Sequence, residues 1–336
     1  MSQIPLYPLR LKPIYQYRLW GGRHLADLLS APLPGYGPIG EAWILSDRDD
    51  KQSRVVNGPL NGQTIHRLME QRPEQLLGKL AGRFRRFPLL LKFLDVHEML
   101  SLQVHPSEAH ADMLPAGETS KTEAWVVLEA GTKSRIYAGL KTGTTENDLR
   151  RYLNSGTVED GLGSFTPKLG DGVFIPAGMV HSLGGDVIVF EVSQNSDVTF
   201  RLYDWNHNDP ETGKPRPLQV ERALACVDFA QNVVGPVTPM VEMTTPEERD
   251  RFFRCEHFEL WRLRGQAPFT VGATGLPRVL VCIEGAGEVE HLGVPYAIRK
   301  GDVLLLPAVV GACPFRPSGA TNLLEIALPE QITTVR

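Results

Sequence analysis

Residues 170–181 read GDGVFIPAGMVH, and this stretch decides the fold class. The Gly-Asp pair is typical of a tight turn, the apolar residues that follow are typical of a short strand, and Pro-Ala-Gly is typical of a second turn. The imidazole of His181 closes the unit. Turns this close to a short strand predict a β-rich protein, with a polar side chain presented where the strand unit ends.

Two upstream stretches, SLQVH at 101–105 and KTEAW at 121–125, carry further metal-ligand types. Gln103 and His105 alternate as strand residues do, so both side chains leave the same face. Glu123 lies in a second strand-like run rich in Trp and Val. Two imidazoles, a carboxylate and a neutral amide suit a divalent metal and leave room for water or substrate. The sequence therefore predicts one metal site, formed by His105, Glu123, His181 and Gln103.

Length, charge and composition limit the class of protein. The 336 residues can form two domains or one long one, and the net charge of −4 gives no reason to expect nucleic acid or an anionic membrane as partner. No apolar run approaches the roughly 18 residues of a membrane span, and the N-terminus lacks the layout of a secretory signal. The four cysteines are scattered without a C-x-x-C pair, as expected of buried thiols in a reducing cytosol. We therefore expect a cytoplasmic protein.

The chain consists mostly of short apolar or alternating runs separated by Gly, Pro and Asn, which predicts a mainly β fold. A few segments have helical patterns instead. Residues 64–79 follow a 3.6-residue period that Pro73 splits, residues 145–153 open with a capping-box-like Thr-x-x-Asp, and residues 217–228 begin with Pro. The predicted strands are 126–128, 173–175, 186–192, 198–203, 279–283 and 302–306.

A second unit follows a linker rich in Pro, Thr and Glu at 234–248. Residues 300–307 read KGDVLLLP and repeat the Gly-Asp-(x)4-Pro spacing found at 170–176. They lack the Gly-x-x-His that follows in the first copy. We therefore predict a catalytic domain over 1–235 and a duplicated, metal-free β domain over 250–330.

The pattern Gly-(x)5-Pro-x-Gly-x-x-His from Gly170 to His181 resembles the second signature of the cupin barrels, although Gly185 stands where the usual later Asn is expected. In the first signature, Gln103-x-His105 replaces the usual His-x-His. Gln-x-His-Pro followed by Lys-x-Glu-x-Trp is similar to the type I phosphomannose isomerases, the zinc-dependent mannose-6-phosphate isomerases, in their shorter bacterial form. This resemblance implies cupin-type jelly-roll β-barrels, a metal-binding barrel plus a degenerate second one, with a few helices.

The resemblance also implies roles for individual residues. His105, Glu123 and His181 match the zinc ligands of the family, with Gln103 as a fourth ligand and one Zn²⁺ per chain. Arg201 matches the active-site arginine, and Ser101, Lys92 and Lys121 match polar residues of the pocket. Longer members hold phosphate with a lysine shortly after the arginine, whereas here Trp205, Asn206 and His207 follow. Phosphate must therefore be held in another way, or the substrate differs.

The leading hypothesis is an isomerase that interconverts mannose 6-phosphate and fructose 6-phosphate through an enediolate. Lys121 is expected to act as a polar catalyst or phosphate ligand together with Arg201, and the sequence does not identify the proton-transfer base. Three alternatives stay open: an isomerase of another sugar phosphate, an iron cupin oxygenase, because two His and one carboxylate also suit non-haem Fe(II), and a non-catalytic sugar-binding cupin. The expected partner is a small sugar phosphate, and the oligomeric state is not predicted.

Overall fold

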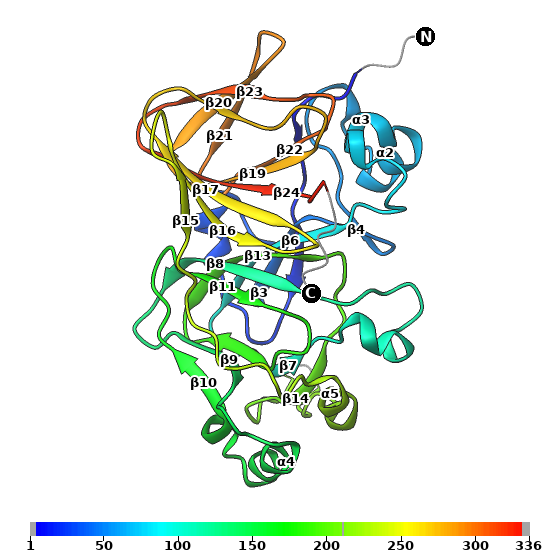
Figure 1. The fold of residues 1–336 in the computed structure, drawn as a ribbon, viewed down its shortest axis with the longest axis vertical. Coiled ribbons are helices and arrows are strands. Elements are labelled where there is room, and N and C mark those ends of the chain that lie inside the picture. Colours follow the sequence, from blue (N-terminus) through cyan, green and yellow to red (C-terminus); the bar gives the residue numbers. More distant parts are fainter. Residues whose placement is uncertain (1–4, 210–211, 331–336) are drawn as a thin grey trace.

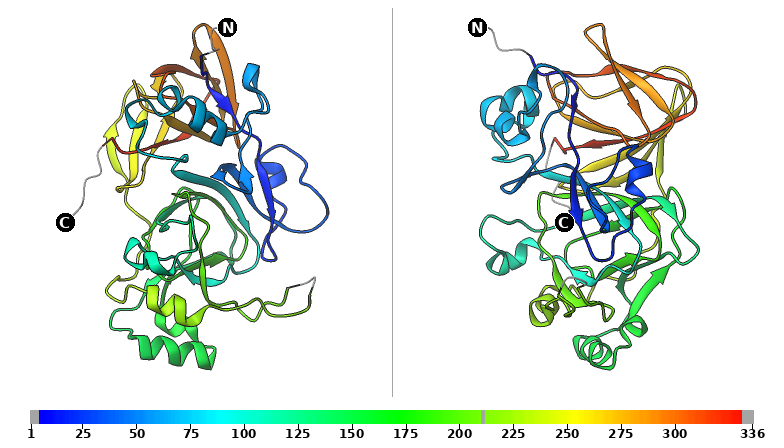
Figure 2. Two further views of the ribbon diagram at one scale, coloured as in Figure 1. Left: turned by 90° about the vertical axis from the view of Figure 1, so that its right-hand side faces the viewer. Right: turned by 180° about the vertical axis from the view of Figure 1, so that it is seen from behind.

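The computed structural model describes residues 5–209 and 212–330, and these form two β units stacked one on the other (Figure 1). The two further views in Figure 2 keep this stacked arrangement. None of the described helices is long and apolar enough to cross a membrane.

The first unit is built from two facing sheets with the strand orders β11-β8-β13-β6-β3-β2 and β10-β9-β12-β7-β14. The larger sheet contains β2 (Ile14–Tyr17), β3 (Ile39–Leu45), β6 (Leu89–Val96), β8 (Glu123–Ala130), β11 (Gly172–Ile175) and β13 (Val187–Gln194). The smaller sheet contains β7 (Leu102–Val104), β9 (Arg135–Leu140), β10 (Leu162–Phe165), β12 (His181–Gly184) and β14 (Phe200–Tyr203). A small hairpin is formed by β4 (Asp47–Arg48) and β5 (Lys51–Gln52).

The second unit has the sheet orders β1-β22-β19-β24-β17-β16-β15 and β18-β23-β20-β21. Its larger sheet contains β1 (Leu9–Arg10), β15 (Met240–Met243), β16 (Glu248–Arg254), β17 (Glu259–Gly265), β19 (Arg278–Glu284), β22 (Val303–Leu306) and β24 (Thr321–Ala327). Its smaller sheet contains β18 (Phe269–Val271), β20 (Ala286–His291), β21 (Val294–Arg299) and β23 (Cys313–Pro317). Strand β1 comes from the N-terminal end of the chain, where Leu9 pairs with Leu305. The boundaries at residues 235 and 250 stay a prediction.

The two units repeat the same strand order. In the larger sheets, the strand order β22-β19-β24-β17-β16-β15 corresponds to β11-β8-β13-β6-β3-β2. In the smaller sheets, β21-β20-β23-β18 corresponds to β10-β9-β12-β7. The strands matched in this way follow one another in the same order along the chain in both units. The expected duplication of a jelly-roll unit is therefore present. Strand β14 is the exception among the sandwich strands of the first unit, because it has no counterpart in the second.

Alternation along the strands places one side of each large sheet in a core that the two units share. Phe93 and Phe190 from the first unit meet there with ring centroids 5.5 Å apart, in the same cluster as Leu260 and Ile326 from the second. The opposite faces look into the two sandwich interiors, which have separate apolar clusters. A further cluster lies on the outer face of the smaller sheet of the first unit, where α4 (Glu146–Ser155) and α5 (Val220–Cys226) pack. The second unit therefore covers the back of the sheet whose front face lines the first interior.

The first two predicted helical segments form where the sequence places them. Residues 64–79 give α2 (Ile65–Gln71), capped by the Thr64 hydroxyl, which accepts from Arg67 N at 3.2 Å, and α3 (Pro73–Leu77). Helix α4 (Glu146–Ser155) begins with the Thr145–Asp148 capping box and ends at Gly156, whose φ of 72° is left-handed. The remaining helices are short: α1 (Leu25–Leu28) and the 3-10 turns Gly58–Leu60, Gly78–Leu80, Glu108–Met113 and Val158–Gly161.

The third helical prediction is wrong at its start. Helix α5 covers Val220–Cys226, and Pro217 lies outside it. The Pro217 carbonyl accepts from Arg201 Nη1 at 2.9 Å, and Gln219 N donates to the Arg201 carbonyl at 2.9 Å. These bonds hold the chain before the helix against β14 in a non-helical form.

Candidate metal centre and substrate pocket

The three strongest ligand candidates converge inside the first unit. His105 directly follows β7, Glu123 opens β8 and His181 opens β12. All three are buried, and their ligand atoms lie within 4.8 Å of one another. The Pro-Ala-Gly turn contributes to this convergence, because Gly178, at a φ of +85°, donates its N–H to the His105 carbonyl at 2.8 Å. This backbone hydrogen bond joins the turn that precedes His181 to His105.

The spacing of the ligand atoms fits a small four-coordinate ion. His105 Nε2 lies 3.4 Å from Glu123 Oε2, and His181 Nε2 lies 3.4 Å from Glu123 Oε1. Gln103 Nε2 lies 3.2 Å from His181 Nε2, so rotating this amide presents its oxygen to the same point. Nitrogen and oxygen ligands bound at about 2.0–2.2 Å in a tetrahedron lie about 3.3–3.6 Å apart. The residues therefore fit a bound divalent metal.

Hydrogen bonds on the far side of each imidazole prepare it as a ligand. His105 Nδ1 donates to the Val198 carbonyl, and His181 Nδ1 donates to the Met179 carbonyl, both at 2.8 Å. A proton on Nδ1 leaves the Nε2 lone pair free and aims it at the centre. Burial, followed by the charge of Lys121, lowers the pKa of His105 to about 4, and burial also lowers the pKa of His181. Both rings are therefore neutral near pH 7, as metal binding requires.

The carboxylate of the centre is ionised. Burial raises the pKa of Glu123, but the Lys121 ammonium and the neighbouring histidines outweigh burial and hold it well below its usual range. Lys121 forms a close ion pair with Glu123 Oε2. Because β8 begins only at Glu123, strand alternation is not what orients Lys121. Its contacts with Glu123 and Glu191 do so.

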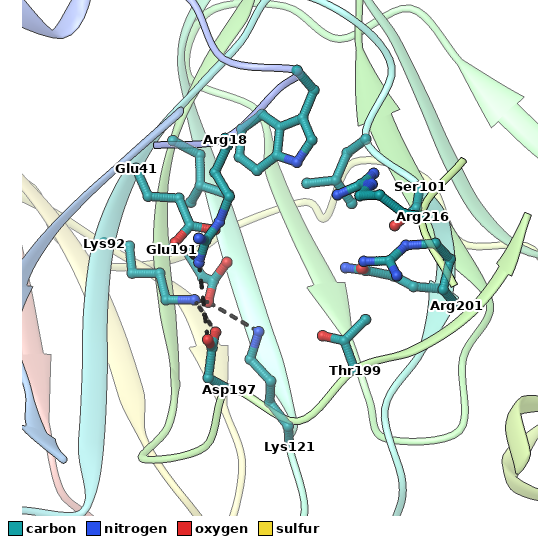
Figure 3. Close-up of a pocket in the computed structure, with 14 residues that line it drawn as sticks. Arg18, Glu41, Lys92, Ser101, Lys121, Glu191, Asp197, Thr199, Arg201 and Arg216 are labelled. Atoms are coloured by element: carbon teal, nitrogen blue, oxygen red, sulfur yellow. Dashed lines mark hydrogen bonds and ion pairs between the residues drawn. The ribbon is translucent and has the colours of Figure 1, made fainter. Parts of the chain in front are cut away.

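A cavity of about 330 Å³ opens beside the metal centre and is lined by Gln103 and Lys121. Figure 3 shows two groups of side chains on opposite sides of it. One group, which we call the paired-charge wall, consists of Arg18, Glu41, Lys92, Lys121, Glu191 and Asp197. The other, which we call the arginine wall, consists of Ser101, Thr199, Arg201 and Arg216.

Strand register places Lys92 and Glu191 together in the paired-charge wall. Lys92 on β6 is directly opposite Glu191 on β13, with Lys92 Nζ 3.6 Å from Glu191 Oε1. Asp197 approaches the same Nζ at 2.9 Å, and Lys121 Nζ lies 3.2 Å from Glu191 Oε1. Burial lowers the pKa of Lys92, but these carboxylates outweigh burial and raise it above its ordinary value.

Arg18 and Glu41 form the remaining ion pair of the paired-charge wall. Arg18 Nη2 lies 2.9 Å from Glu41 Oε2, and the Trp43 indole donates to the same oxygen at 2.6 Å. Burial raises the pKa of Glu41, but Lys92 and Arg18 outweigh burial and lower it. Each cation of the paired-charge wall therefore has a carboxylate partner, which offsets the cost of burying charge.

The positive charges of the arginine wall are less completely neutralised than those of the paired-charge wall. Arg216 makes a two-pronged ion pair with Asp204, whereas Arg201 Nε lies 3.9 Å from the same carboxylate. Burial, followed by the charge of Arg216, lowers the pKa of Arg201. Two guanidinium groups thus share Asp204 on the side of the cavity that also carries the Ser101 hydroxyl.

The structure brings all eight predicted site residues to the centre or its cavity. Lys92, Ser101, Gln103, Lys121 and Arg201 line the cavity beside the centre formed by His105, Glu123 and His181, and their individual roles stay predictions. The sequence analysis assigned no role to Arg18, Glu41, Glu191 or Arg216. A signal for Glu191 was present, since it interrupts the apolar run VIVFEV at 187–192. Nothing local marked Arg216.

A jelly-roll interior holding two imidazoles, a carboxylate and an amide defines a metal-binding protein of the cupin type. Residues 8–127 match the sequence profile of the type I phosphomannose isomerase catalytic domain. The probable mannose-6-phosphate isomerase GmuF of Bacillus subtilis is 31% identical over 317 residues, which cover 92% of this chain and 98% of that protein. The mannose-6-phosphate isomerase ManA of the same organism is 33% identical over 306 residues, covering 90% and 94%. The chain belongs to the type I phosphomannose isomerase family.

Solved structures agree with this assignment. The crystal structure of the mannose 6-phosphate isomerase from Bacillus subtilis matches with a TM-score of 0.87 at 29% identity, covering 95% of this chain and 99% of that one. A putative mannosephosphate isomerase from Archaeoglobus fulgidus shares the fold, with a TM-score of 0.76 at 21% identity over 97% and 99% of the two chains.

Proposed function

We propose that this protein is a zinc-dependent aldose–ketose isomerase that interconverts mannose 6-phosphate and fructose 6-phosphate. The observation that carries the proposal is the convergence of His105, Glu123 and His181 beside a cavity rich in cations. The relatives that match over nine tenths of the chain bear the corresponding names. A cavity of about 330 Å³ lies within the range of about 300–1,000 Å³ typical of small-molecule sites.

The reaction moves a proton between C1 and C2 through an enediolate, and its main difficulty is the negative charge that develops on oxygen. His105, Glu123 and His181, with Gln103 as a fourth ligand, would hold the zinc ion. When bound, the ion supplies Lewis-acid stabilisation of the sugar oxygens. Imidazole and carboxylate ligands with an open position are the usual setting for a catalytic zinc ion.

The chain's own residues supply the proton and charge handling. Burial lowers the pKa of both lysines, but Asp197 and Glu191 at Lys92, and Glu123 and Glu191 at Lys121, outweigh burial and keep both protonated. Each lysine can therefore donate a hydrogen bond to a developing oxyanion. A proton acceptor must be unprotonated and within reach of the sugar. We assign this role to Asp197, which lines the cavity with 29% of its side chain exposed and is kept unprotonated because Lys92 and Lys121 outweigh burial and lower its pKa. Glu191, only 3% exposed, orients the two ammonium groups.

A coupled assay for fructose 6-phosphate formed from mannose 6-phosphate tests the proposal. Protein stripped with a chelator is expected to be inactive, and stoichiometric Zn²⁺ is expected to restore turnover. Protein that demonstrably carries one zinc ion per chain and still gives no turnover would exclude this reaction. Turnover of other hexose and pentose phosphates in the same assay would identify a different sugar phosphate as the substrate.

The same preparation separates the other chemistries. Elemental analysis that finds iron, together with oxygen uptake when substrate is added, would point to an oxygenase. Binding of the sugar phosphate without product formation, at full metal occupancy, would point to a sugar-binding protein.

A further inference from the structure

The two walls of the cavity differ in how their cations are neutralised. On the paired-charge wall, Lys92 and Lys121 each contact carboxylates that belong to that wall. On the arginine wall, Arg201 and Arg216 share Asp204, and no other carboxylate approaches either guanidinium within 4.0 Å among the described residues. The arginine wall therefore carries unbalanced positive charge, which favours an anion.

Arg216 owes its place to contacts made after β14. Residues 204–209 lead away from the strand and residues 212–219 return to it, with Asp209 N donating to the Lys214 carbonyl at 2.9 Å. In the returning segment, Arg216 donates hydrogen bonds to both carboxylate oxygens of Asp204. The Gln219 side chain accepts from Arg201 N at 3.0 Å, which fixes the returning segment to β14. Arg216 is thus held beside Arg201 although it lies far along the chain.

Both guanidinium groups keep donors for a ligand. Arg201 Nη1 donates to the Pro217 carbonyl and Nε is fully buried, which leaves Nη2 for a ligand. Arg216 donates Nε and Nη2 to Asp204, which leaves Nη1 without a partner among the described residues. The side chains of Arg201 and Arg216 are 19% and 18% exposed, which leaves each open to the cavity. A planar fork of N–H groups matches phosphate oxygens two at a time.

Strand register sets the distance between the arginine wall and the metal centre. On the smaller sheet, Gln103 lies opposite His181 on one side and opposite Arg201 on the other. Two strand spacings place the backbones of His181 and Arg201 about 9–10 Å apart. A substrate with its carbonyl carbon at the centre and its anion at the arginine wall must therefore carry the two groups at opposite ends.

We propose that Arg216, paired with Arg201, binds the terminal phosphate of the sugar and makes the enzyme specific for phosphorylated substrates. The assignment rests on the isomerase function proposed above for the identity of the sugar. It answers how phosphate is held when Trp205, Asn206 and His207 occupy the positions after Arg201. Asp204 positions the Arg216 side chain and offsets part of its charge when no substrate is bound.

Four variants test the assignment: Arg216→Gln, Arg216→Lys, Asp204→Asn and the double variant Asp204→Asn/Arg216→Gln. Two quantities are measured for each: the Kd of inorganic phosphate by calorimetry on the zinc-loaded protein, and KM and kcat for mannose 6-phosphate and for unphosphorylated mannose. Arg150→Gln serves as the control for loss of one positive charge, because Arg150 pairs with Glu146 and Glu221 on exposed surface outside the cavity.

For Arg216→Gln we expect phosphate affinity and 1/KM for mannose 6-phosphate to fall about 10- to 100-fold, because a charge-assisted two-pronged contact is lost. Arg216→Lys should recover part of this, about 3-fold or more, since a point charge remains without the fork. Asp204→Asn keeps Arg216 and should bind phosphate at least as tightly as the wild type. The double variant should stay as weak as Arg216→Gln.

The double variant decides between binding and a structural role. If Arg216 only neutralises the buried Asp204, removing both charges restores the phosphate Kd and KM to wild-type values, and the assignment is overturned. A phosphate Kd for Arg216→Gln within twofold of the Arg150→Gln control also overturns it. Wild-type protein that binds phosphate through Arg216 but does not turn over mannose 6-phosphate would leave this assignment standing and refute the proposed reaction.

Discussion

The two β units repeat one strand order, yet among the described residues only the first brings histidine and carboxylate ligands together, and a comparison by register shows why. Glu123 lies opposite Ile175 on β11, and in the second unit Arg278 lies opposite Leu306 on β22. Ile175 and Leu306 both precede the proline of the repeated turn. A guanidinium therefore occupies the place of the carboxylate ligand.

Other positions of the centre have changed as well. Counting from the Gly-Asp turn, His181 corresponds to Ala312, and by register Lys92 corresponds to Trp261. The interior of the second unit is filled by a cluster that includes Leu263, Phe269 and Phe315. The same backbone thus supports an apolar core or a polar site, and the side chains of a few register positions decide between them.

One carboxylate has been kept in both units. Glu191 lies opposite Trp125, which comes two residues after Glu123. In the second unit, Glu325 lies opposite Leu280, which comes two residues after Arg278. Glu191 contacts Lys92 and Lys121, whereas Glu325 accepts from Gly272 N at 2.7 Å and pairs with Arg249 at 3.2 Å. The first serves a cavity and the second joins strands of its own unit.

The largest expected difference between the units concerns the metal. His181→Gln removes one of the ligands, so we expect bound zinc to fall from one ion per chain to none and turnover to fall at least about 10³-fold. The measurements are elemental analysis and the coupled assay. His257→Gln, in the second unit, is the control and should keep both metal and activity. Full zinc occupancy in His181→Gln would show that the centre lies elsewhere.

The kept carboxylates give the next largest contrast. Glu191→Gln frees Lys92 and Lys121 from their shared partner, and we expect kcat to fall about 10²-fold or more, as for disturbed proton-transfer groups. Glu325→Gln should leave kcat and KM within twofold and should change only the unfolding transition. Equal effects of the two substitutions on kcat would contradict the division of roles.

The pH dependence of stability should also differ between the units. Lys92, Lys121 and Arg18 outweigh burial and lower the pKa of Asp197, so its contribution is present above the unfolded pKa of about 3.9 and is lost as the pH falls below it. Asp197→Asn should therefore cost about 1–3 kcal/mol at pH 7, and less as the pH drops below about 4. Urea unfolding of wild type and variant over a pH series measures this.

The contribution of Glu325 to stability should change with pH in the opposite direction to that of Asp197. Burial raises its pKa, and the partners Arg249 and Arg278 only partly offset burial. Its contribution to stability is full below the unfolded pKa of about 4.3 and is lost as the pH rises through the folded pKa. Glu325→Gln should remove this fall from the same unfolding series. A Glu325→Gln profile parallel to that of the wild type would contradict this assignment.

The smallest effect is expected from adding a histidine to the second unit, which should not create a second metal site. Ala312→His restores the histidine of the repeated turn, but Ala312 is exposed and Arg278 still occupies the carboxylate position. We expect metal content to stay at one ion per chain and kcat to be unchanged. A second bound zinc ion would show that the missing histidine alone had disabled this unit.

Much of this comparison was accessible from the sequence. The spacing around Gly170–His181, and its repeat at Gly301–Pro307, predicts the duplicated fold. Helix α4 was predictable because its capping box and terminal glycine are local signals. Local pattern and turn chemistry suffice for such features because they involve neighbours in the chain.

The walls of the cavity were less accessible, because they depend on contacts between distant segments. Lys92 and Glu191 become partners through the pairing of β6 with β13, and the 217–219 segment was mistaken for helix although it bonds to β14. Glu41 and Arg18 meet across the edge of the same sheet. A charged residue within an apolar strand indicates a buried pair, but only the register says which partner it has.

The pairing of β1 with β22 links the order of synthesis to the completion of the fold. Leu9 is fully buried, and its strand partner Leu305 follows it by roughly 300 residues in the sequence. At about 5–20 residues per second, β1 leaves the ribosome tens of seconds before its partner. A chain that stops before β22 cannot form this pairing, so such a chain would expose Leu9 to proteases.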